Sequence, residues 1–251
     1  MINIGLMKSL GKIGDLIVVI LAVTFVPKLA VVLTHKVFPF INSIDPDKVF
    51  LWVSFHHIFQ LLFALVLMKL WLTRRLNDYG FNLNDYKRSL KIFFYFCHIY
   101  LIPVFIVNVL PNIISGRPPM FKYPLNTRNI IGFLGFEYLL SGTGEEPLFR
   151  GFAIIVLSQS WKRVFRIWRI EISSAGLIAT ALFMYGHIGF KVFPFEITYI
   201  SWPQQVWSLG LGLYYAIVFH KTKSLLCPIL SHGYSNGIIF TILYAMTFIM
   251  K

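Results

Sequence analysis

The sequence predicts an all-α fold, a polytopic transmembrane helical bundle of seven to eight spans. Only 13% of its 251 residues are charged and 57% are hydrophobic, whereas about 25% of the residues in a soluble domain are charged. The mean hydropathy is +0.71. Apolar runs of roughly 17–25 residues, the length that crosses a bilayer, recur along the whole chain. We therefore expect residues 1–251 to form a single transmembrane domain.

Seven apolar regions are the predicted spans, at residues 16–33, 49–72, 92–110, 129–161, 172–189, 205–219 and 225–250. The fourth region is unusually long, because a helix of its roughly 33 residues would measure about 50 Å against a hydrocarbon core of about 30 Å. Gly142 and Gly144, followed by Pro147 in a position suited to a first helical turn, predict a break or kink in this region. Splitting it there would give eight spans.

The net charge of +13 comes from Lys and Arg residues that fall mainly in short loops between the apolar runs. The positive-inside rule places basic residues in such loops, so the charge indicates a membrane lipid environment and excludes nucleic acid as a partner. With seven spans and a cytoplasmic N-terminus, the inside segments carry 13 Lys and Arg residues and the outside segments carry 7. We predict a multi-pass integral protein of the cell membrane whose N-terminus is cytoplasmic.

Three charged side chains stand together in the fourth apolar region, at Glu145, Glu146 and Arg150. An ionisable group at membrane depth costs at least about 2.5–3.5 kcal/mol on insertion scales, and such groups are functional-site candidates by default. On a helix, Glu146 and Arg150 share a face and can pair. Glu145 points about 100° away and is free to meet groups from other helices. The pattern predicts one structural carboxylate and one working carboxylate.

Polar side chains in two later spans are expected to converge on Glu145. His187 lies four residues after Phe183, and His232 and Asn236 are also four apart, so they share one face of the last span. Unpaired polar groups in lipid cost several kcal/mol, and these residues should therefore meet one another or a water-filled cavity.

A carboxylate, two imidazoles and a carboxamide suit hydrolysis, because the carboxylate can take a proton from water and the other groups can hold that water or donate to an oxyanion. Spacing alone leaves other interpretations open. Glu145, His187 and His232 could hold zinc with one open position. The same groups could also form purely structural hydrogen bonds between helices, or a pathway for protons or ions.

Other polar residues are weaker candidates for a site. His56, His57 and Gln60 cluster in the second span without a carboxylate, which favours packing or the lining of a cavity. His98 is isolated in the third span. Glu137 lies about two turns before the glutamate pair and could widen the polar cavity, but we leave it outside the predicted site.

Three motifs occur in one order, EEPLFRG at 145–151, LFMYGH at 182–187 and KTKSLLCPILSH at 221–232, followed by Asn236. They resemble the C-a-a-X protease and bacteriocin-processing (CPBP, or Abi) family of intramembrane proteases, whose eukaryotic branch is the type II prenyl-protein endopeptidase. The resemblance covers residues 129–240, the predicted catalytic core, and no motif position departs from the family pattern.

The resemblance implies that Glu145 activates the attacking water with the help of His187, and that His232 and Asn236 stabilise the oxyanion. The supporting residues would be Glu146, Arg150 and Phe183. The family has been described both as metal-dependent and as a metal-free glutamate protease. Because the third motif ends in Asn and no third histidine is evident, we favour chemistry without a cofactor, with zinc as the alternative.

The sequence therefore predicts a hydrolase, an intramembrane endopeptidase that cuts a membrane-associated peptide or protein. The candidate substrates are a prenylated C-terminus, a peptide pheromone and a bacteriocin-like leader. The alternative is a non-enzymatic membrane scaffold or bacteriocin-immunity protein that binds a peptide or a signalling partner and keeps the polar cluster for packing. A small transporter ranks last, because the sequence has no evident inverted repeat or charged pathway across several spans.

Overall fold

A computed structural model of the chain describes residues 10–71, 75–191 and 193–250. The predicted end of the second span at residue 72 lies outside these ranges, as do three of the basic residues counted for the topology, Lys8, Arg74 and Lys251.

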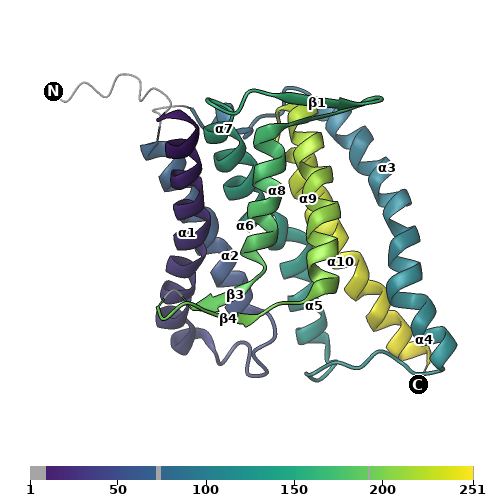
Figure 1. Cartoon of the computed structure of the whole chain (residues 1–251). Coiled ribbons are helices and arrows are strands. Elements are labelled where there is room, and N and C mark those ends of the chain that lie inside the picture. The colour runs from purple at the N-terminus through teal and green to yellow at the C-terminus, as the bar shows by residue number, and fades with distance from the viewer. Residues whose placement is uncertain (1–9, 72–74, 192, 251) are drawn as a thin grey trace.

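Seven helical segments occupy the seven apolar regions of the sequence (Figure 1). The first two are α1 (Gly11–Ile41) and α2 (Leu51–Leu70). The third joins α3 (Tyr86–Val104), η2 (Phe105–Val109) and α4 (Leu110–Ser115), and the fourth starts with α5 (Thr127–Gly135). The last three are α8 (Ser174–Gly186), α9 (Trp202–Thr222) and α10 (Leu226–Ile249). By length and composition, α1, α2, the segment 86–115 and α10 are each able to cross a membrane. The predicted helical membrane bundle is confirmed.

The fourth segment is helical throughout, so of the break or kink predicted at Gly142 and Gly144 the break is absent. After α5 it passes through the π-helical turns of η3 (Phe136–Ser141), the short α6 (Gly142–Glu146), a second π-helical stretch, η4 (Pro147–Ala153), and α7 (Ile154–Leu157). Both glycines have their place inside α6 rather than in a loop. Single π-helical turns inside helices frequently mark functional sites, and here they flank the two adjacent glutamates on both sides.

Side-chain caps explain where several helices begin. Asn126 accepts a hydrogen bond from the backbone N–H of Asn129 at the start of α5, and Ser173 accepts one from Gly176 at the start of α8. Ser201 caps α9 in the same way. These side chains satisfy N–H groups that have no partner inside the helix.

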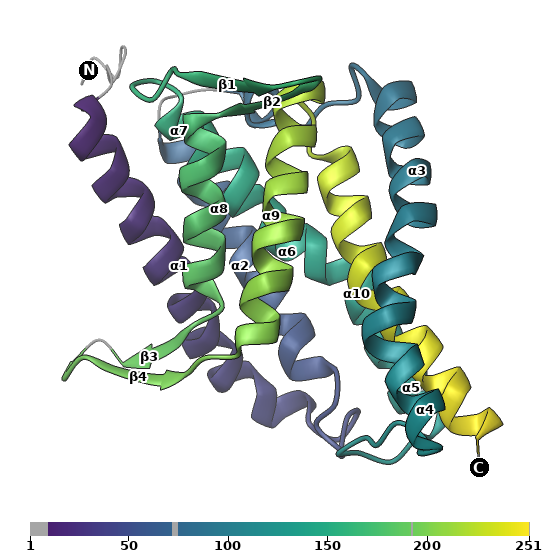
Figure 2. The ribbon, with the colours of Figure 1, turned by 45° about the vertical axis from the view of Figure 1, so that its right-hand side comes forward.

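Two β-hairpins depart from the all-α expectation, in segments that the sequence analysis treated as loops or as the start of a span. Strands β1 (Val164–Ile167) and β2 (Ile170–Ser173) pair antiparallel, as do β3 (Gly189–Lys191) and β4 (Glu196–Tyr199). The predicted span at 172–189 was therefore placed two residues early at its start, because residues 172 and 173 belong to β2. Two-stranded hairpins are marginal alone, and these two lie at opposite ends of the bundle (Figure 2).

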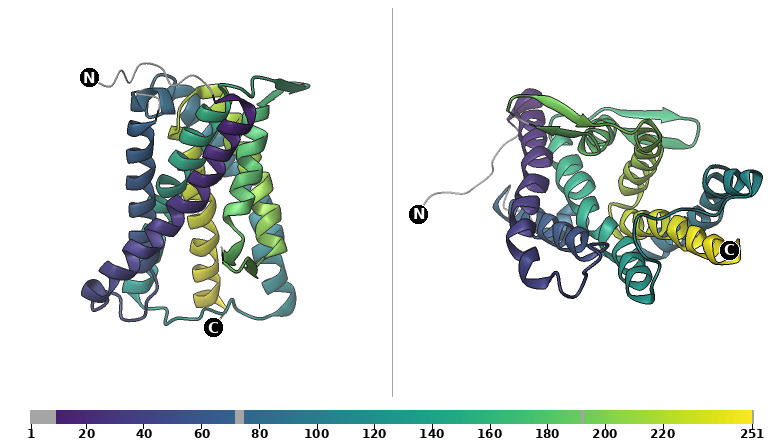
Figure 3. Two further views of the ribbon diagram at one scale, coloured as in Figure 1. Left: turned by 60° about the vertical axis from the view of Figure 1, so that its left-hand side comes forward. Right: turned by 90° about the horizontal axis from the view of Figure 1, so that it is seen from below.

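The helix that carries the glutamates runs through the middle of the molecule. The α6 helix packs against α2 on one side and α10 on the other, and η4 packs against α8. In the end-on view, α1 and α3 lie on opposite sides of the bundle (Figure 3, right). A side chain on Gly142 would place its Cβ 2.5 Å from the carbonyl oxygen of Ile229, so glycine is what allows α6 and α10 to approach this closely.

The basic segments that were predicted to share one membrane side gather at one end of the bundle (Figure 1). There the indole Nε1 of Trp161, just before the β1–β2 hairpin, donates to the carbonyl of Lys12 in α1 at 3.2 Å. The turn between α9 and α10 lies at the same end, where the N–H of Leu225 donates to the carbonyl of Gly80, in the segment between α2 and α3, at 2.9 Å. Strands β3 and β4 and the end of α10 lie at the opposite end.

Apolar side chains cover much of the outer surface, whereas charged groups lie inside. Ile99 on α3 is 64% exposed and Leu29 on α1 is 50% exposed, but Glu146 and Arg150 are completely buried. This distribution suits a lipid environment, where apolar residues face the hydrocarbon and ionisable groups face the bundle interior.

Candidate active site

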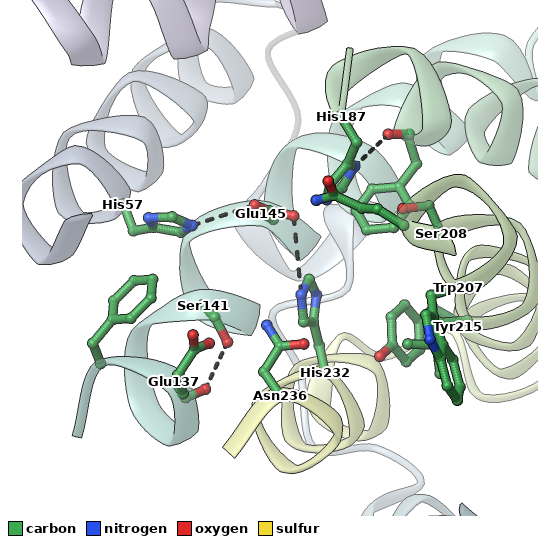
Figure 4. Close-up of a pocket in the computed structure, with 14 residues that line it drawn as sticks. His57, Glu137, Ser141, Glu145, His187, Trp207, Ser208, Tyr215, His232 and Asn236 are labelled. Atoms are coloured by element: carbon green, nitrogen blue, oxygen red, sulfur yellow. Dashed lines mark hydrogen bonds and ion pairs between the residues drawn. The ribbon is translucent and has the colours of Figure 1, made fainter. Parts of the chain in front are cut away.

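A cavity of about 300 Å³ lies within the bundle, between α2, the fourth segment, the end of α8, α9 and α10 (Figure 4). The side chains that line it are His57, Phe136, Glu137, Ser141, Glu145, Phe183, His187, Gln204, Trp207, Ser208, Leu211, Tyr215, His232 and Asn236. All four residues predicted to carry the chemistry, Glu145, His187, His232 and Asn236, are in this set. The structure therefore brings together groups from three separate regions of the sequence.

Glu145 lies at the centre of the site, where its two carboxylate oxygens have different surroundings (Figure 4). Its Oε1 lies 3.3 Å from Nε2 of His57. Its Oε2 is buried and has no hydrogen-bond partner within the described part of the chain, and it lies 4.0 Å from Nε2 of His232. A water can bridge a polar contact of that length, and an unpaired polar atom beside a polar cavity is a candidate partner for an ordered water.

His187, which follows the last residue of α8, is held in one orientation by its own helix. Its Nδ1 donates to the carbonyl of Phe183 at 2.8 Å, and its ring packs edge-on against the Phe183 ring with centroids 4.6 Å apart. With Nδ1 occupied as a donor, Nε2 is the nitrogen left to accept a hydrogen bond, for example from a water.

Glu146 and Arg150 form the ion pair that their spacing predicts. The Nε of Arg150 lies 3.2 Å from Oε2 of Glu146, and Nη1 donates to Oε1 at 3.3 Å, with both side chains fully buried. The guanidinium group also donates to the Gly212 carbonyl at 3.3 Å and lies 4.3 Å from the centre of the Phe183 ring. Phe183 thus packs against both Arg150 and His187, in line with a supporting place in the site.

His232 lies between the two glutamates. Its Nδ1 lies 2.7 Å from Oε1 of Glu146, and since that oxygen belongs to the ion-paired carboxylate, Nδ1 is the donor. Its ring stacks on Tyr215 with centroids 5.3 Å apart and planes inclined by 14°. The Nε2 atom then faces Glu145 and the cavity, where a protonated His232 would donate a second hydrogen bond.

Asn236 lies one turn after His232 on α10 and makes a side-chain hydrogen bond to Glu137. Glu137 is 7% exposed and lines the same cavity as Glu145. An amide nitrogen carries two hydrogens, so an N–H group of Asn236 that donates to Glu137 leaves a second N–H available for the cavity.

Two residues that the sequence analysis left outside the predicted site line the cavity. His57 had been assigned to packing or cavity lining because no carboxylate stands near it in the sequence, and its partner Glu145 is 88 positions away. Glu137 had been left outside the site, although its spacing of eight residues from Glu145 already placed both carboxylates on neighbouring parts of one helix face. The structure leaves His98 outside the cavity, on the exposed face of α3.

Zinc held by Glu145, His187 and His232, the alternative that the sequence offers, stays a prediction. No group of three or more His, Cys, Asp or Glu side chains within residues 10–71, 75–191 and 193–250 is arranged to hold a metal ion. Zinc ligands about 2.1 Å from the metal at tetrahedral angles lie about 3.4 Å apart, which is closer than the 4.0 Å between Glu145 and Nε2 of His232. The hydrogen bond from Nδ1 of His232 to Glu146 leaves Nε2 as the nitrogen that a metal would use.

The fold and the cavity define an integral membrane protein that holds a carboxylate among imidazoles inside a helical bundle. Residues 127–238 match the family described as "Type II CAAX prenyl endopeptidase Rce1-like". The chain therefore contains an Rce1-like domain, consistent with membership of the CPBP family, and the matched range nearly coincides with the predicted core at 129–240. No curated protein and no solved structure matches the chain. The family indicates intramembrane endopeptidase activity of the CAAX type.

Proposed function

We propose that this protein is an intramembrane endopeptidase in which Glu145 activates the attacking water. The observation that carries the proposal is the carboxylate of Glu145, which lines a polar cavity and whose buried Oε2 has no hydrogen-bond partner among the described residues. A carboxylate oxygen left free in this way can accept a proton from a bound water. The unoccupied Nε2 of His187 is a second acceptor on the same cavity and can help to hold that water.

The reaction consumes one water and needs no other reactant. The water oxygen bonds to the scissile carbonyl carbon while Oε2 of Glu145 takes one of the water protons, which gives a tetrahedral intermediate with a negative oxygen. When the intermediate collapses, the C–N bond breaks and the proton on Glu145 passes to the leaving nitrogen. The products are a carboxylic acid and an amine, and Glu145 returns to its ionised form.

Two donors on α10 are placed to stabilise the negative oxygen. These are the free N–H of Asn236 and, in its protonated form, Nε2 of His232. Both are held before substrate arrives, Asn236 by Glu137 and His232 by Glu146 and Tyr215. Donors that are already oriented in a cavity of low dielectric stabilise developing charge without further reorganisation.

The setting of the site supports a membrane-associated substrate. Polar groups line the cavity, whereas the outer surface is apolar, which suits a substrate that is already associated with the membrane. Candidates are a peptide pheromone, a bacteriocin-like leader and a prenylated C-terminus, and the description of the matched family favours the last of these.

The direct test presents purified protein in lipid with a pool of amphipathic and prenylated peptides and follows cleavage by mass spectrometry, with and without a chelator. We expect wild type to cleave, Glu145→Ala to lose cleavage, and His98→Ala, a change on the exposed face of α3, to cleave like wild type. The chelator is expected to leave the rate unchanged. Equal loss in both variants would contradict the assignment of Glu145.

The scaffold alternative predicts a different result with a near-isosteric change. Glu145→Gln preserves the shape of the side chain and its ability to form hydrogen bonds, so a protein that uses the cluster for packing and partner binding would keep its biological function. The protease proposal requires Glu145→Gln to be inactive, because an amide cannot take a proton from water. A fully functional Glu145→Gln protein would establish the scaffold.

A further inference from the structure

His57 on α2, in the N-terminal half of the chain, is one of the residues that line the cavity. His57 lies outside residues 127–238, the range that matches the family, yet its Nε2 lies 3.3 Å from Oε1 of Glu145. The imidazole is 12% exposed and lines the same cavity as the proposed catalytic residues. In Figure 4 it approaches Glu145 from the side opposite to His187 and His232.

The backbone is shaped to allow this contact. A Cβ atom on Gly144, the residue before the glutamate pair, would lie 2.6 Å from Cβ of His57. Any larger residue at position 144 would therefore push α2 away from α6. The His57 ring is further held edge-on by Phe136, with ring centroids 4.9 Å apart.

The hydrogen bonds of His57 determine where a proton must lie. Its Nδ1 lies 2.9 Å from the carbonyl oxygen of Val53, which can only accept, so Nδ1 carries a hydrogen. A hydrogen bond between Nε2 and Oε1 of Glu145 then needs a second proton, carried either by the imidazole or by the carboxyl group. Glu145 can take a proton from water only if it is ionised, so the second proton belongs on His57.

The other ionisable groups around this pair do not replace it. His56 on α2 stacks on Trp52 and meets His57 edge-on at 5.2 Å. Nε2 of His232 lies 4.0 Å from Oε2, the other carboxylate oxygen of Glu145. Glu137 is hydrogen-bonded to Asn236. His187 faces the cavity from the end of α8. His57 is therefore the group that holds Oε1.

We propose that His57 is a positioning residue for the proteolytic reaction: as an imidazolium, it donates from Nε2 to Oε1 of Glu145 and so fixes the orientation of this carboxylate at the cavity. This inference rests on the proposed function and deepens it. It also gives α2 a role in the chemistry. Glu145 lies within residues 127–238, the range that matches the family, and His57, which would orient it, lies on α2 outside that range.

The kinetic test uses two substitutions of His57 and a matched neighbour. His57→Gln keeps a donor for Glu145, whereas His57→Leu removes it. Displacing a catalytic group by about 1 Å can cost about 10²-fold in rate, so we expect His57→Leu to lose about 10²-fold in kcat with little change in KM. His57→Gln should recover at least part of that loss. His56→Phe, which keeps the ring stacked on Trp52, should cleave like wild type.

A second measurement follows the proton itself and does not depend on proteolysis. Nitrogen NMR of ¹⁵N-histidine-labelled protein in lipid nanodiscs at neutral pH reports which ring nitrogens carry hydrogen, and the His57 signals are assigned by their absence in His57→Gln. We expect both nitrogens of His57 to be protonated in wild type and only Nδ1 in Glu145→Gln. Folding of each variant is checked by its thermal unfolding.

The outcomes separate this inference from the proposed function. Active wild-type protein with an equally active His57→Leu variant would overturn the positioning role, as would a neutral His57 in the wild-type spectrum. The opposite combination is a protein that cleaves nothing but whose His57 carries two protons in wild type and one in Glu145→Gln. That result would support the His57–Glu145 hydrogen bond and refute the protease.

Discussion

The Nδ1 atom of His232 lies 2.7 Å from Oε1 of Glu146, although the two residues are 86 positions apart in the sequence. This hydrogen bond ties α10 to the buried ion pair of Glu146 and Arg150. It also gives two adjacent carboxylates different surroundings. Glu146 is ion-paired with Arg150 and hydrogen-bonded to His232, whereas Oε2 of Glu145 has no hydrogen-bond partner among the described residues and lies 4.0 Å from Nε2 of His232. We therefore expect Glu146 to hold the helices together and Glu145 to be available for chemistry.

Glu146→Ala should therefore destabilise the fold, while Glu145→Ala should mainly abolish activity. Removing one partner of a buried ion pair costs about 3–5 kcal/mol, because the other charge is left buried and unpaired, and here that charge is Arg150. Thermal unfolding in detergent, followed by tryptophan fluorescence, should show a lower midpoint for Glu146→Ala than for Glu145→Ala. Equal midpoints for the two variants would contradict this expectation.

Asn236→Ala should slow the chemical step without weakening substrate binding. Loss of one oriented donor to a developing oxyanion typically costs about 10²–10³-fold in kcat, and the amide of Asn236 is one of the two donors proposed here. Steady-state kinetics should show kcat reduced by that factor and KM nearly unchanged. Asn84→Ala, an exposed loop change, is the control, and a loss confined to KM would argue for a binding role instead.

Gly142→Ala should disturb the site by separating two helices. The new Cβ would lie 2.5 Å from the Ile229 carbonyl and 3.0 Å from Cβ of His232, so α10 must move. Overpacking of this kind costs about 1–3 kcal/mol, and the movement also withdraws His232 from Glu145. Unfolding midpoint and activity should both fall. Gly210→Ala on α9, where nothing lies within 4 Å of the new atom, should preserve both, and a harmless Gly142→Ala would refute the close approach.

Local sequence patterns were enough to predict the helical segments and the paired carboxylate. The spacing of Glu146 and Arg150 fixes their shared helix face, and the length of each apolar run locates a helix without knowledge of its neighbours. The β-hairpins were missed because they are short and lie in segments with basic or mixed composition. At Gly142 the sequence left a break and a kink open, because glycine and proline suit either when tertiary packing is unknown. The helix is continuous there.

The candidate site was predictable only where its residues lie in recognisable motifs. Glu145, His187, His232 and Asn236 were identified from such motifs and line one cavity, and their catalytic roles stay predictions. His57 carries no local signal, because its contact with Glu145 depends on the packing of α2 against α6. Long-range packing of that kind is absent from any window of sequence.

Asp47, in the loop between α1 and α2, gives a pH-dependent contribution to stability. Hydrogen bonds from Asn129 and Arg128 hold the pKa of its carboxyl group below the usual value. A lowered pKa in the folded state means that the contribution is present above the ordinary pKa of Asp, near 3.8, and is lost as the pH falls through the folded value. Asp47→Asn should lower the unfolding midpoint at neutral pH, and the difference from wild type should shrink in strong acid. A difference independent of pH would contradict this account.

Two exposed hairpin residues allow a test of which end of the bundle faces the cytoplasm. Arg166 on β1 and Glu196 on β4 lie in hairpins at opposite ends (Figure 2), with side chains 73% and 56% exposed. The positive-inside rule places the Arg-rich β1–β2 hairpin in the cytoplasm. After Cys97 and Cys227 are replaced, single Arg166→Cys and Glu196→Cys variants are exposed to an impermeant maleimide on intact cells. Glu196→Cys should be labelled directly and Arg166→Cys only after permeabilisation, whereas the reverse pattern would invert the proposed orientation.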